Sequence, residues 1–229
     1  MIKDREIRAI VRAIQYVGRR YVVIEALGSE DMAHGPGQFT KVTFEDHEGT
    51  YDRFYSIASS TRPDGSFELC IILDDLRLRE LIANWQMGTI FICSRPSGKF
   101  HVPSYDRNVV CVAGGSGITP LRAIIEDRVQ NHAAGQTVLL YGCQRDDEIP
   151  FYESLEVLSR LSSRLNLEFF ADENPLRRAR TGRPLDHLQA FILKDADYLL
   201  CGPPAFMEAA QLLLTGSGVS KDVIHRDRY

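Results

Sequence analysis

The segment with the clearest capacity for chemistry is Gly114-Gly115-Ser116-Gly117-Ile118-Thr119-Pro120, which separates an apolar run from a stretch with helical spacing. Glycines allow positive φ angles and let backbone N–H groups approach a ligand closely. The N-terminus of the following helix adds the positive end of its dipole, so the loop suits the pyrophosphate of a dinucleotide. The spacing matches neither GxGxxG nor a Walker motif. A tight strand-to-helix turn that binds nothing is the alternative for this loop taken alone.

A second glycine, in Cys201-Gly202-Pro203-Pro204, also follows an apolar run. Ligands of open α/β sheets bind beyond the carboxyl ends of the strands, and both loops fall at that position. Two such loops on one edge favour a dinucleotide site. Taken alone, Cys201 is better explained as a small buried residue that ends a strand.

The composition excludes several classes of protein. The chain has 229 residues, 44% of them hydrophobic, and a formal net charge of −4, whereas nucleic-acid binders usually show a basic excess. The five cysteines include no CxxC pair, so zinc sites and four-cysteine iron–sulfur clusters lack a ligand set, and reduced buried thiols are expected. A charged N-terminus without a signal-peptide core, and no apolar stretch near the ~20 residues of a membrane span, predict a cytoplasmic protein.

The first part of the chain has the pattern of a small β-domain. Six short apolar segments, several rich in β-branched residues, alternate with turn signals such as Gly35-Pro36-Gly37. Helical spacing of apolar residues predicts one helix over 76–85. Six strands and a helix predict an antiparallel β-barrel with a helix covering one end. The predicted strands cover 7–14, 21–27, 39–44, 54–58, 67–73 and 89–94.

The pattern changes near residue 105, where strands begin to alternate with helices. Apolar strands in repeated β-α units imply a parallel sheet with helices on both faces, and right-handed crossovers give a doubly wound domain. The sequence thus predicts a β-barrel domain over 1–104 and an α/β domain over 105–229. The predicted strands cover 109–113, 137–141, 167–170, 198–201 and 223–225, and the helices 120–131, 151–165, 185–193 and 204–214.

Five motifs resemble those of the ferredoxin–NADP reductase superfamily, in its order and at its spacings. Arg53-Phe54-Tyr55-Ser56-Ile57-Ala58-Ser59 resembles the RxYSxxS flavin signature, and Gly37-Gln38-Phe39 resembles the GQF entry into the preceding strand. The segment 96–100 resembles PxGxF, 114–120 is similar to GGxGxTP, and 201–204 is similar to CGPP. The resemblance covers nearly the whole chain and implies an FAD-binding barrel followed by an NAD(P)-binding domain.

The resemblance gives barrel residues a place in the flavin site. It implies that Arg53 pairs with the flavin phosphate, that Tyr55 stacks on the isoalloxazine ring, and that Ser56 hydrogen-bonds near flavin N5. The alternatives are a surface salt bridge to a neighbour such as Asp52, a core aromatic, and an ordinary strand hydroxyl. The implied cofactor-binding residues of the barrel also include Phe54 and Ile71.

In the second domain, the resemblance implies that Cys201 lies close to the nicotinamide and helps to place its C4 against flavin N5. Asp227 and Tyr229 resemble the acidic and aromatic residues that close the family's last strand, with Tyr229 covering the flavin. Asp227 is one methylene shorter than the usual glutamate, and a frayed terminus without a role is the alternative for this end. The candidate catalytic residues are Ser56, Cys201, Asp227 and Tyr229. The implied nucleotide-binding residues are Gly114, Gly115, Ser116, Gly117, Thr119, Arg145, Gly202 and Pro203.

The segment before the barrel helix departs from the family pattern, and the residues near the predicted ribose site leave the choice between NADH and NADPH open. The usual Gly…Ser pair before the barrel helix is absent, and Arg77 or Arg79 either replaces its contacts to FAD or forms a solvated helix face. FAD is expected because most relatives use it, with FMN as the alternative. After the second strand, Arg145 offers a cation for the 2′-phosphate of NADP, whereas Asp172-Glu173 after the third offers carboxylates for NAD. A basic cluster follows at 177–180, so the expected donor stays NAD(P)H.

The expected function is hydride transfer from NAD(P)H to a bound flavin and delivery of single electrons to a separate carrier. A ferredoxin, a flavodoxin or the oxygenase component of a multicomponent system is the expected acceptor. A free-flavin or ferric-chelate reductase is one alternative, and an electron-transfer subunit of a larger complex is another. A nucleotide-binding regulatory module without flavin is a third, against which the segment 53–59 argues.

Overall fold

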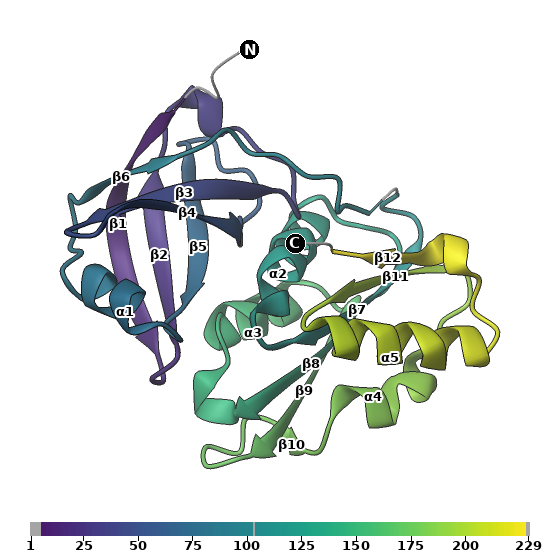
Figure 1. The fold of residues 1–229 in the computed structure, drawn as a ribbon. Coiled ribbons are helices and arrows are strands. Elements are labelled where there is room, and N and C mark those ends of the chain that lie inside the picture. Colours follow the sequence, from purple (N-terminus) through teal and green to yellow (C-terminus); the bar gives the residue numbers. More distant parts are fainter. Residues whose placement is uncertain (1–5, 103, 228–229) are drawn as a thin grey trace.

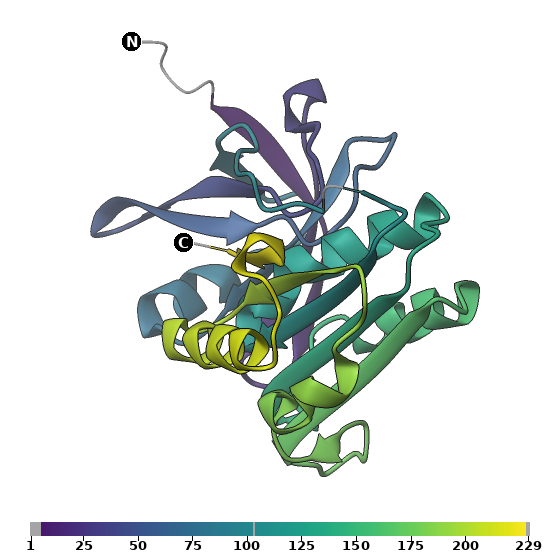
Figure 2. The ribbon, with the colours of Figure 1, turned by 90° about the vertical axis from the view of Figure 1, so that its right-hand side faces the viewer.

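Two six-stranded sheets organise the computed structural model, which describes residues 6–102 and 104–227. The first sheet is antiparallel and the second is parallel, and helix α2 lies between them (Figure 1). Figure 2 shows the purple-to-blue first half and the teal-to-yellow second half packed side by side. The strands of the first sheet are β1 (Ile7–Val17), β2 (Tyr21–Leu27), β3 (Phe39–Asp46), β4 (Gly49–Ser56), β5 (Ser66–Ile72) and β6 (Ile90–Cys93), in the order β4-β3-β6-β1-β2-β5.

The first sheet closes into a barrel around a buried core, and on β1 the inward positions alternate with solvent-facing ones. On β1, Ile7, Ala9 and Val11 are buried while the residues between them are exposed. The two edge strands meet where Ala58 N–H donates to the Glu68 carbonyl at 2.8 Å, beside a bridge between Ile57 and Leu69. Helix α1 (Leu76–Ala83) packs its buried residues against the barrel core.

The second sheet has the order β10-β9-β8-β7-β11-β12, and its pairs are parallel. Helices α2 and α3 contribute to the core on one face, and α5 contributes to the core on the other. Chain order reverses between β7 and β11, so the loops after these two strands flank the switch point, where such sheets bind ligands. The elements are β7 (Asn108–Gly114), α2 (Ile118–Gln130), β8 (Thr137–Arg145), α3 (Tyr152–Leu161), β9 (Leu165–Glu173), β10 (Arg180–Thr181), α4 (Pro184–His187), β11 (Ala196–Cys201), α5 (Pro204–Gly216) and β12 (Ile224–Arg226).

The predicted fold class is confirmed, an antiparallel barrel followed by a doubly wound α/β sheet. Several element bounds differ from the predictions, and the largest differences are in two places. Strand β4 begins at Gly49 and ends at Ser56, earlier than the predicted 54–58, and the short β10 was not predicted. The predicted helix over 185–193 is a four-residue helix, α4, followed by a 3₁₀ turn.

The connection between the two sheets contacts both of them. Ser97 forms two backbone hydrogen bonds with Phe39 of β3, at 2.8 and 2.9 Å, while Phe100 packs in the core beside α2. We therefore keep the boundary between residues 104 and 105 as a proposal, inside this connection.

Two charged side chains, Arg122 and Glu126, are buried where α2 packs against the barrel. Arg122 is 4% exposed, donates to the Ala58 carbonyl at 2.9 Å, and forms ion pairs with Glu68 at 2.8 Å and Glu126 at 2.9 Å. Glu126 in turn accepts from Ser60 N–H at 2.6 Å. This network fixes α2 against the end of the segment 53–59.

None of the described helices is both long enough and apolar enough to cross a bilayer. The five cysteines are free thiols, and no group of three or more metal-ligating side chains occurs within residues 6–102 and 104–227.

Candidate active site

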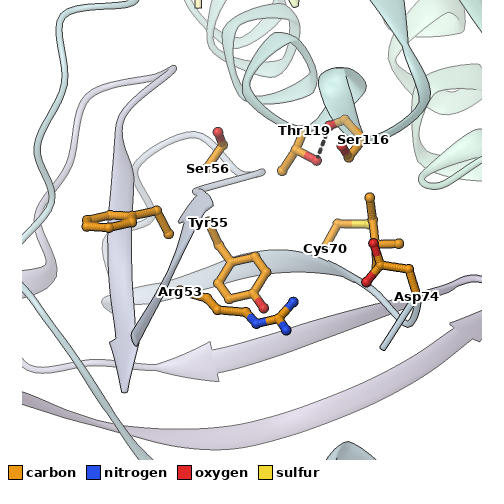
Figure 3. Close-up of a pocket in the computed structure, with 9 residues that line it drawn as sticks. Arg53, Tyr55, Ser56, Cys70, Asp74, Ser116 and Thr119 are labelled. Atoms are coloured by element: carbon orange, nitrogen blue, oxygen red, sulfur yellow. Dashed lines mark hydrogen bonds between the residues drawn. The ribbon is translucent and has the colours of Figure 1, made fainter. Parts of the chain in front are cut away.

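A cavity of about 380 Å³, here called the barrel cavity, lies between the barrel wall and residues 114–120, here called the glycine loop (Figure 3). Strand β4 and the end of β5 supply one side, and the start of α2 supplies the other. The lining residues are Arg53, Phe54, Tyr55, Ser56, Cys70, Ile72, Asp74, Ser116 and Thr119.

Strand alternation decides which β5 residues face this cavity. Cys70 and Ile72 line it, whereas Ile71 is 0% exposed and packs inside the barrel core. The Ile71 side chain therefore does not face this cavity, because successive side chains of a strand point to opposite faces, and cofactor binding by this residue stays a prediction.

Arg53 reaches the cavity with its charge already paired. Its guanidinium donates to the carboxylate of Asp75, which also caps the N-terminus of α1 by accepting from Arg77 N–H at 2.8 Å. The expected neighbour Asp52 instead pairs with Lys41 at 2.9 Å. A phosphate at this position would share Arg53 with Asp75.

The aromatic wall of the cavity carries a buried polar atom. The Tyr55 hydroxyl forms no hydrogen bond of normal geometry within the described residues, and its burial raises the pKa of Tyr55 against the opposing Arg53 charge. Phe54 is 57% exposed and packs edge-on against Phe39. Ser56 is buried in the wall. Flat rings with hydroxyls around them fit a planar heteroaromatic ligand with a polar rim.

The glycine loop is held tightly by its neighbours. A Cβ at Gly117 would lie 2.1 Å from the Cys201 carbonyl oxygen, so no larger residue fits between the loops that follow β7 and β11. Gly115 has a φ of +56°, which favours glycine. Thr119 does not cap α2, since its hydroxyl donates to the Ser116 carbonyl at 2.7 Å (Figure 3).

A second cavity, of about 510 Å³ and here called the sheet cavity, lies over the carboxyl ends of β7, β8 and β9. The glycine loop is its common wall with the barrel cavity, because Gly114 and Gly115 line one and Ser116 and Thr119 line the other. The lining residues are Arg20, Tyr21, Gly114, Gly115, Gly142, Cys143, Gln144, Asp172, Gly182, Arg183, Pro184, Leu185, Pro203, Ala205 and Phe206.

Three arginines predicted near phosphates have protein partners instead. Arg145 contacts Asp147 at 3.0 Å and Glu173 at 2.6 Å, and lies outside the walls of the sheet cavity. Arg77 donates to Asp46 at 2.6 Å, and Arg79 donates to a backbone carbonyl. Contacts of Arg77 and Arg79 with local partners are compatible with the alternative of a helix face, and the binding role of Arg145 stays a prediction.

The predicted catalytic residues of the second domain lie behind the cavities. Cys201 is 0% exposed, and its thiol donates to the Asp227 carboxylate at 3.7 Å. Asp227 is buried, and its N–H donates to the Leu200 carbonyl at 3.0 Å. Neither Cys201 nor Gly202 belongs to the described walls of the two cavities, and Pro203 lines the sheet cavity. Tyr229 lies outside the described residues, so its role stays a prediction.

Sequence reasoning missed the contribution of the β1–β2 hairpin, Arg20 and Tyr21, to the sheet cavity. No local motif marks these two residues, because their place depends on how the barrel docks against the parallel sheet. Cys70 and Ile72 were accessible to prediction through strand alternation.

Comparison with known proteins agrees with this arrangement. A family model described as the oxidoreductase NAD-binding domain matches residues 111–212. The electron transfer component of xylene/toluene monooxygenase from Pseudomonas putida is 23% identical over 231 residues, which cover 98% of this chain and 65% of that protein. These similarities agree with the resemblance of the chain to the ferredoxin–NADP(+) reductase superfamily.

Two further similarities extend over most of the chain. The ferredoxin reductase component of 3-ketosteroid-9-alpha-monooxygenase from Mycolicibacterium smegmatis is 27% identical, over 87% of this chain and 56% of that protein. The FAD/NAD-binding domain of nitric oxide dioxygenase from Vibrio cholerae O1 biovar El Tor superimposes with a TM-score of 0.86 at 22% identity, covering 97% and 98% of the two chains. The chain spans less than two thirds of the length of these two curated relatives.

Proposed function

We propose that the chain is an NAD(P)H-dependent flavoprotein reductase, which takes hydride from NAD(P)H onto bound FAD and passes single electrons to a carrier protein. The observation that carries this proposal is the shared wall between the two cavities. Gly114 and Gly115 face one cavity while Ser116 and Thr119 face the other, so ligands bound in the two cavities would lie on adjacent sides of the same loop and could reach each other around its edge.

The barrel cavity fits the isoalloxazine ring of a flavin in chemical character. Tyr55 and Phe54 offer aromatic surface, and the buried Tyr55 hydroxyl, which has no hydrogen bond of normal geometry within the described residues, would be available to the polar rim of a bound ring. Ser56 and Thr119 offer hydroxyls on the side facing the glycine loop. Arg53 supplies the nearby positive charge for a phosphate, shared with Asp75.

Bound FAD would supply the conversion between hydride transfer and single-electron transfer. The residues of the chain would bind, orient and exclude water. Gly115, at a φ of +56°, and Gly117, against the Cys201 carbonyl, keep the loop close to its neighbours, and the α2 N-terminus adds a positive dipole end for phosphate. Packing of Gly117 on the Cys201 carbonyl leaves no room there for water. Ser56, Cys201, Asp227 and Tyr229 remain the proposed catalytic residues.

The test is an anaerobic absorbance titration of FAD-loaded protein with NADH and, separately, with NADPH. Bleaching of the flavin band at about 450 nm is the expected result with at least one donor. The same titration of protein loaded with FMN distinguishes the two flavins. If no flavin binds, or if bound flavin stays oxidised with both donors, the reductase proposal fails.

One observation favours a free-flavin reductase as a second candidate. The pairing of Arg53 with Asp75, beside Asp74 in the cavity wall, weakens the positive field available to a flavin phosphate. A dissociable flavin would then serve as substrate rather than as resident cofactor. Retention of FAD through gel filtration, and a turnover rate independent of added flavin, would exclude this candidate.

For the acceptor, the relatives favour a redox protein. The two curated relatives are an electron transfer component and a ferredoxin reductase component of monooxygenases. We therefore propose that a ferredoxin, a flavodoxin or an oxygenase component accepts the electrons in the cytoplasm. The test of a protein acceptor is the rate at which the enzyme and NAD(P)H reduce a purified ferredoxin. This rate should lie well above the rate without the enzyme.

A further inference from the structure

The hairpin between β1 and β2 leaves the barrel and contacts the parallel sheet. A Cβ at Gly18, in its turn, would lie 2.4 Å from Cγ of Glu148, and Arg20 Nη1 donates to Gln144 Oε1 at 3.3 Å. The Arg20 carbonyl accepts from Leu73 N–H at 2.7 Å, which ties the same turn to the end of β5. The hairpin is thus held from both sides at the edge of the sheet cavity.

Tyr21 brings a hydroxyl from the barrel to the glycine loop. Its side chain is 2% exposed and packs with Val23, Cys70 and Phe151. A Cβ at Gly115 would lie 3.6 Å from the Tyr21 hydroxyl oxygen. Burial raises the pKa of Tyr21 to about 12, so at neutral pH the hydroxyl keeps its proton and can donate a hydrogen bond.

The arginines in and near the wall of the sheet cavity differ in their partners. The guanidinium of Arg183 lies 4.0 Å from the Asp172 carboxylate, and Arg145 is engaged by two carboxylates. The hydrogen bond of Arg20 goes to a neutral amide, that of Gln144, and its guanidinium also lies 5.7 Å from the centre of the Tyr21 ring. Among the described residues no carboxylate forms an ion pair with Arg20, although Glu148 lies against the turn of the same hairpin.

We propose that Arg20 and Tyr21 form a phosphate-binding arm, by which the barrel domain holds the pyrophosphate of the nicotinamide dinucleotide against the glycine loop. This inference rests on the proposed function and extends it, because it gives the barrel domain a direct part in binding the nucleotide. Gly115 lies at the α2 N-terminus, where phosphate oxygens are favoured, and the arm faces it from the other domain. The pyrophosphate is common to NADH and NADPH, so the arm serves both.

The test compares Arg20→Ala with Arg20→Lys, Tyr21→Phe and the control Arg19→Ala. Arg19 is the exposed neighbour on the same turn and lies outside the cavity wall, so its replacement removes the same charge from the same hairpin. Binding of NAD⁺ and of NADP⁺ to FAD-loaded protein is measured by titration calorimetry, which needs no turnover. Stopped-flow reduction by NADH and NADPH then gives the rate at saturating donor.

We expect Arg20→Ala to raise the Kd for NAD⁺ and for NADP⁺ about tenfold, or about 1.4 kcal/mol, and alike for both. Arg20→Lys recovers part of the loss, Tyr21→Phe raises both Kd values about threefold, and Arg19→Ala stays within about twofold. The difference between Arg20→Ala and the unmodified chain shrinks as salt rises from about 0.1 M to about 1 M, because screening weakens an exposed charge contact. The saturating reduction rate is retained, since binding and not chemistry is altered.

Three results would overturn the inference. A loss confined to NADP⁺ would assign Arg20 to the 2′-phosphate, and equal Kd values for Arg20→Ala and Arg19→Ala would remove the phosphate contact altogether. A fall in the saturating rate with unchanged Kd would make the hairpin a structural support. Failure of the unmodified protein to be reduced by either donor is a different outcome, which rejects the proposed function itself.

Discussion

Replacement of Arg122 by methionine should uncouple the two domains. Arg122 is 4% exposed at the domain interface and joins Glu68, Glu126 and the Ala58 carbonyl. Methionine fills much of the same volume without the charge, so the change leaves two buried carboxylates without their shared cation. Removal of one partner from a buried ion pair typically costs about 3–5 kcal/mol.

The expected magnitude lies at the lower end of that range. Glu68 keeps its ion pair with Arg62 at 2.9 Å, and Glu126 keeps the Ser60 N–H at 2.6 Å. We therefore expect a loss of about 3 kcal/mol in the free energy of unfolding, equivalent to a fall of about 6–12 °C in Tm for a protein of this size. A second change, Glu126→Gln, removes one stranded charge and should restore about 1 kcal/mol or more of that loss.

Unfolding in guanidinium chloride, followed by two signals, measures both the loss and the uncoupling. Trp85, the single tryptophan, packs in the barrel core and reports on that domain, whereas far-ultraviolet circular dichroism is dominated by the helices of the α/β domain. The two transitions should coincide in the unmodified chain and separate in Arg122→Met. Arg160→Met, at an exposed position of α3, is the control. A loss below 1 kcal/mol with coincident transitions would refute the assignment of Arg122 as the link between the domains.

Three other changes test separate parts of the structure. The hydrogen bond from Arg77 lowers the pKa of Asp46 from 3.8 to about 2. The ionised Asp46 therefore contributes fully to stability above about pH 4, and this contribution is lost as the pH falls towards 2. Asp46→Asn should flatten that part of an acid-unfolding curve. Gly117→Ala should lower Tm by several degrees, because its Cβ would lie 2.1 Å from a carbonyl oxygen, whereas Gly216→Ala, with open space around it, should leave Tm unchanged or raise it; equal melting curves would contradict this. Tyr55→Phe removes an unsatisfied buried hydroxyl and should stabilise the flavin-free protein by about 1 kcal/mol while weakening FAD binding in a fluorescence titration; tighter FAD binding would argue against a role for that hydroxyl.

Much of the fold follows from apolar periodicity, and its failures have local causes. The early part of β4 carries Gly49, Thr50 and Asp52 on an edge strand, where exposed polar residues hide the strand pattern. The helix predicted over 185–193 breaks after α4 although its apolar residues continue, because a short 3₁₀ turn also buries Leu188. The spacing of apolar residues alone predicts neither the early start of β4 nor the early end of this helix.

The candidate site was predictable where one motif supplies both position and chemistry. Residues 53–56 line the barrel cavity together with Ser116 and Thr119 of the glycine loop, and their roles in binding remain predictions. Arg145 could not be judged from sequence, because its carboxylate partners, Asp147 and Glu173, come from two different elements. Arg20 was hidden for the same reason, since only the docking of the barrel brings it to the sheet.

The glycine loop, with a cavity on each of its faces, restricts how a reductase of the proposed kind can diversify. A substitution or insertion in this segment alters the sites for two different molecules at once, so both sites would have to adapt together. The distant end of the sheet cavity, where Asp172 lies beside Arg183, touches the nucleotide side alone. Exchange of one electron donor for another is therefore open to natural selection, and to an engineer, at Asp172 and Arg183, while the sequence of the loop stays fixed.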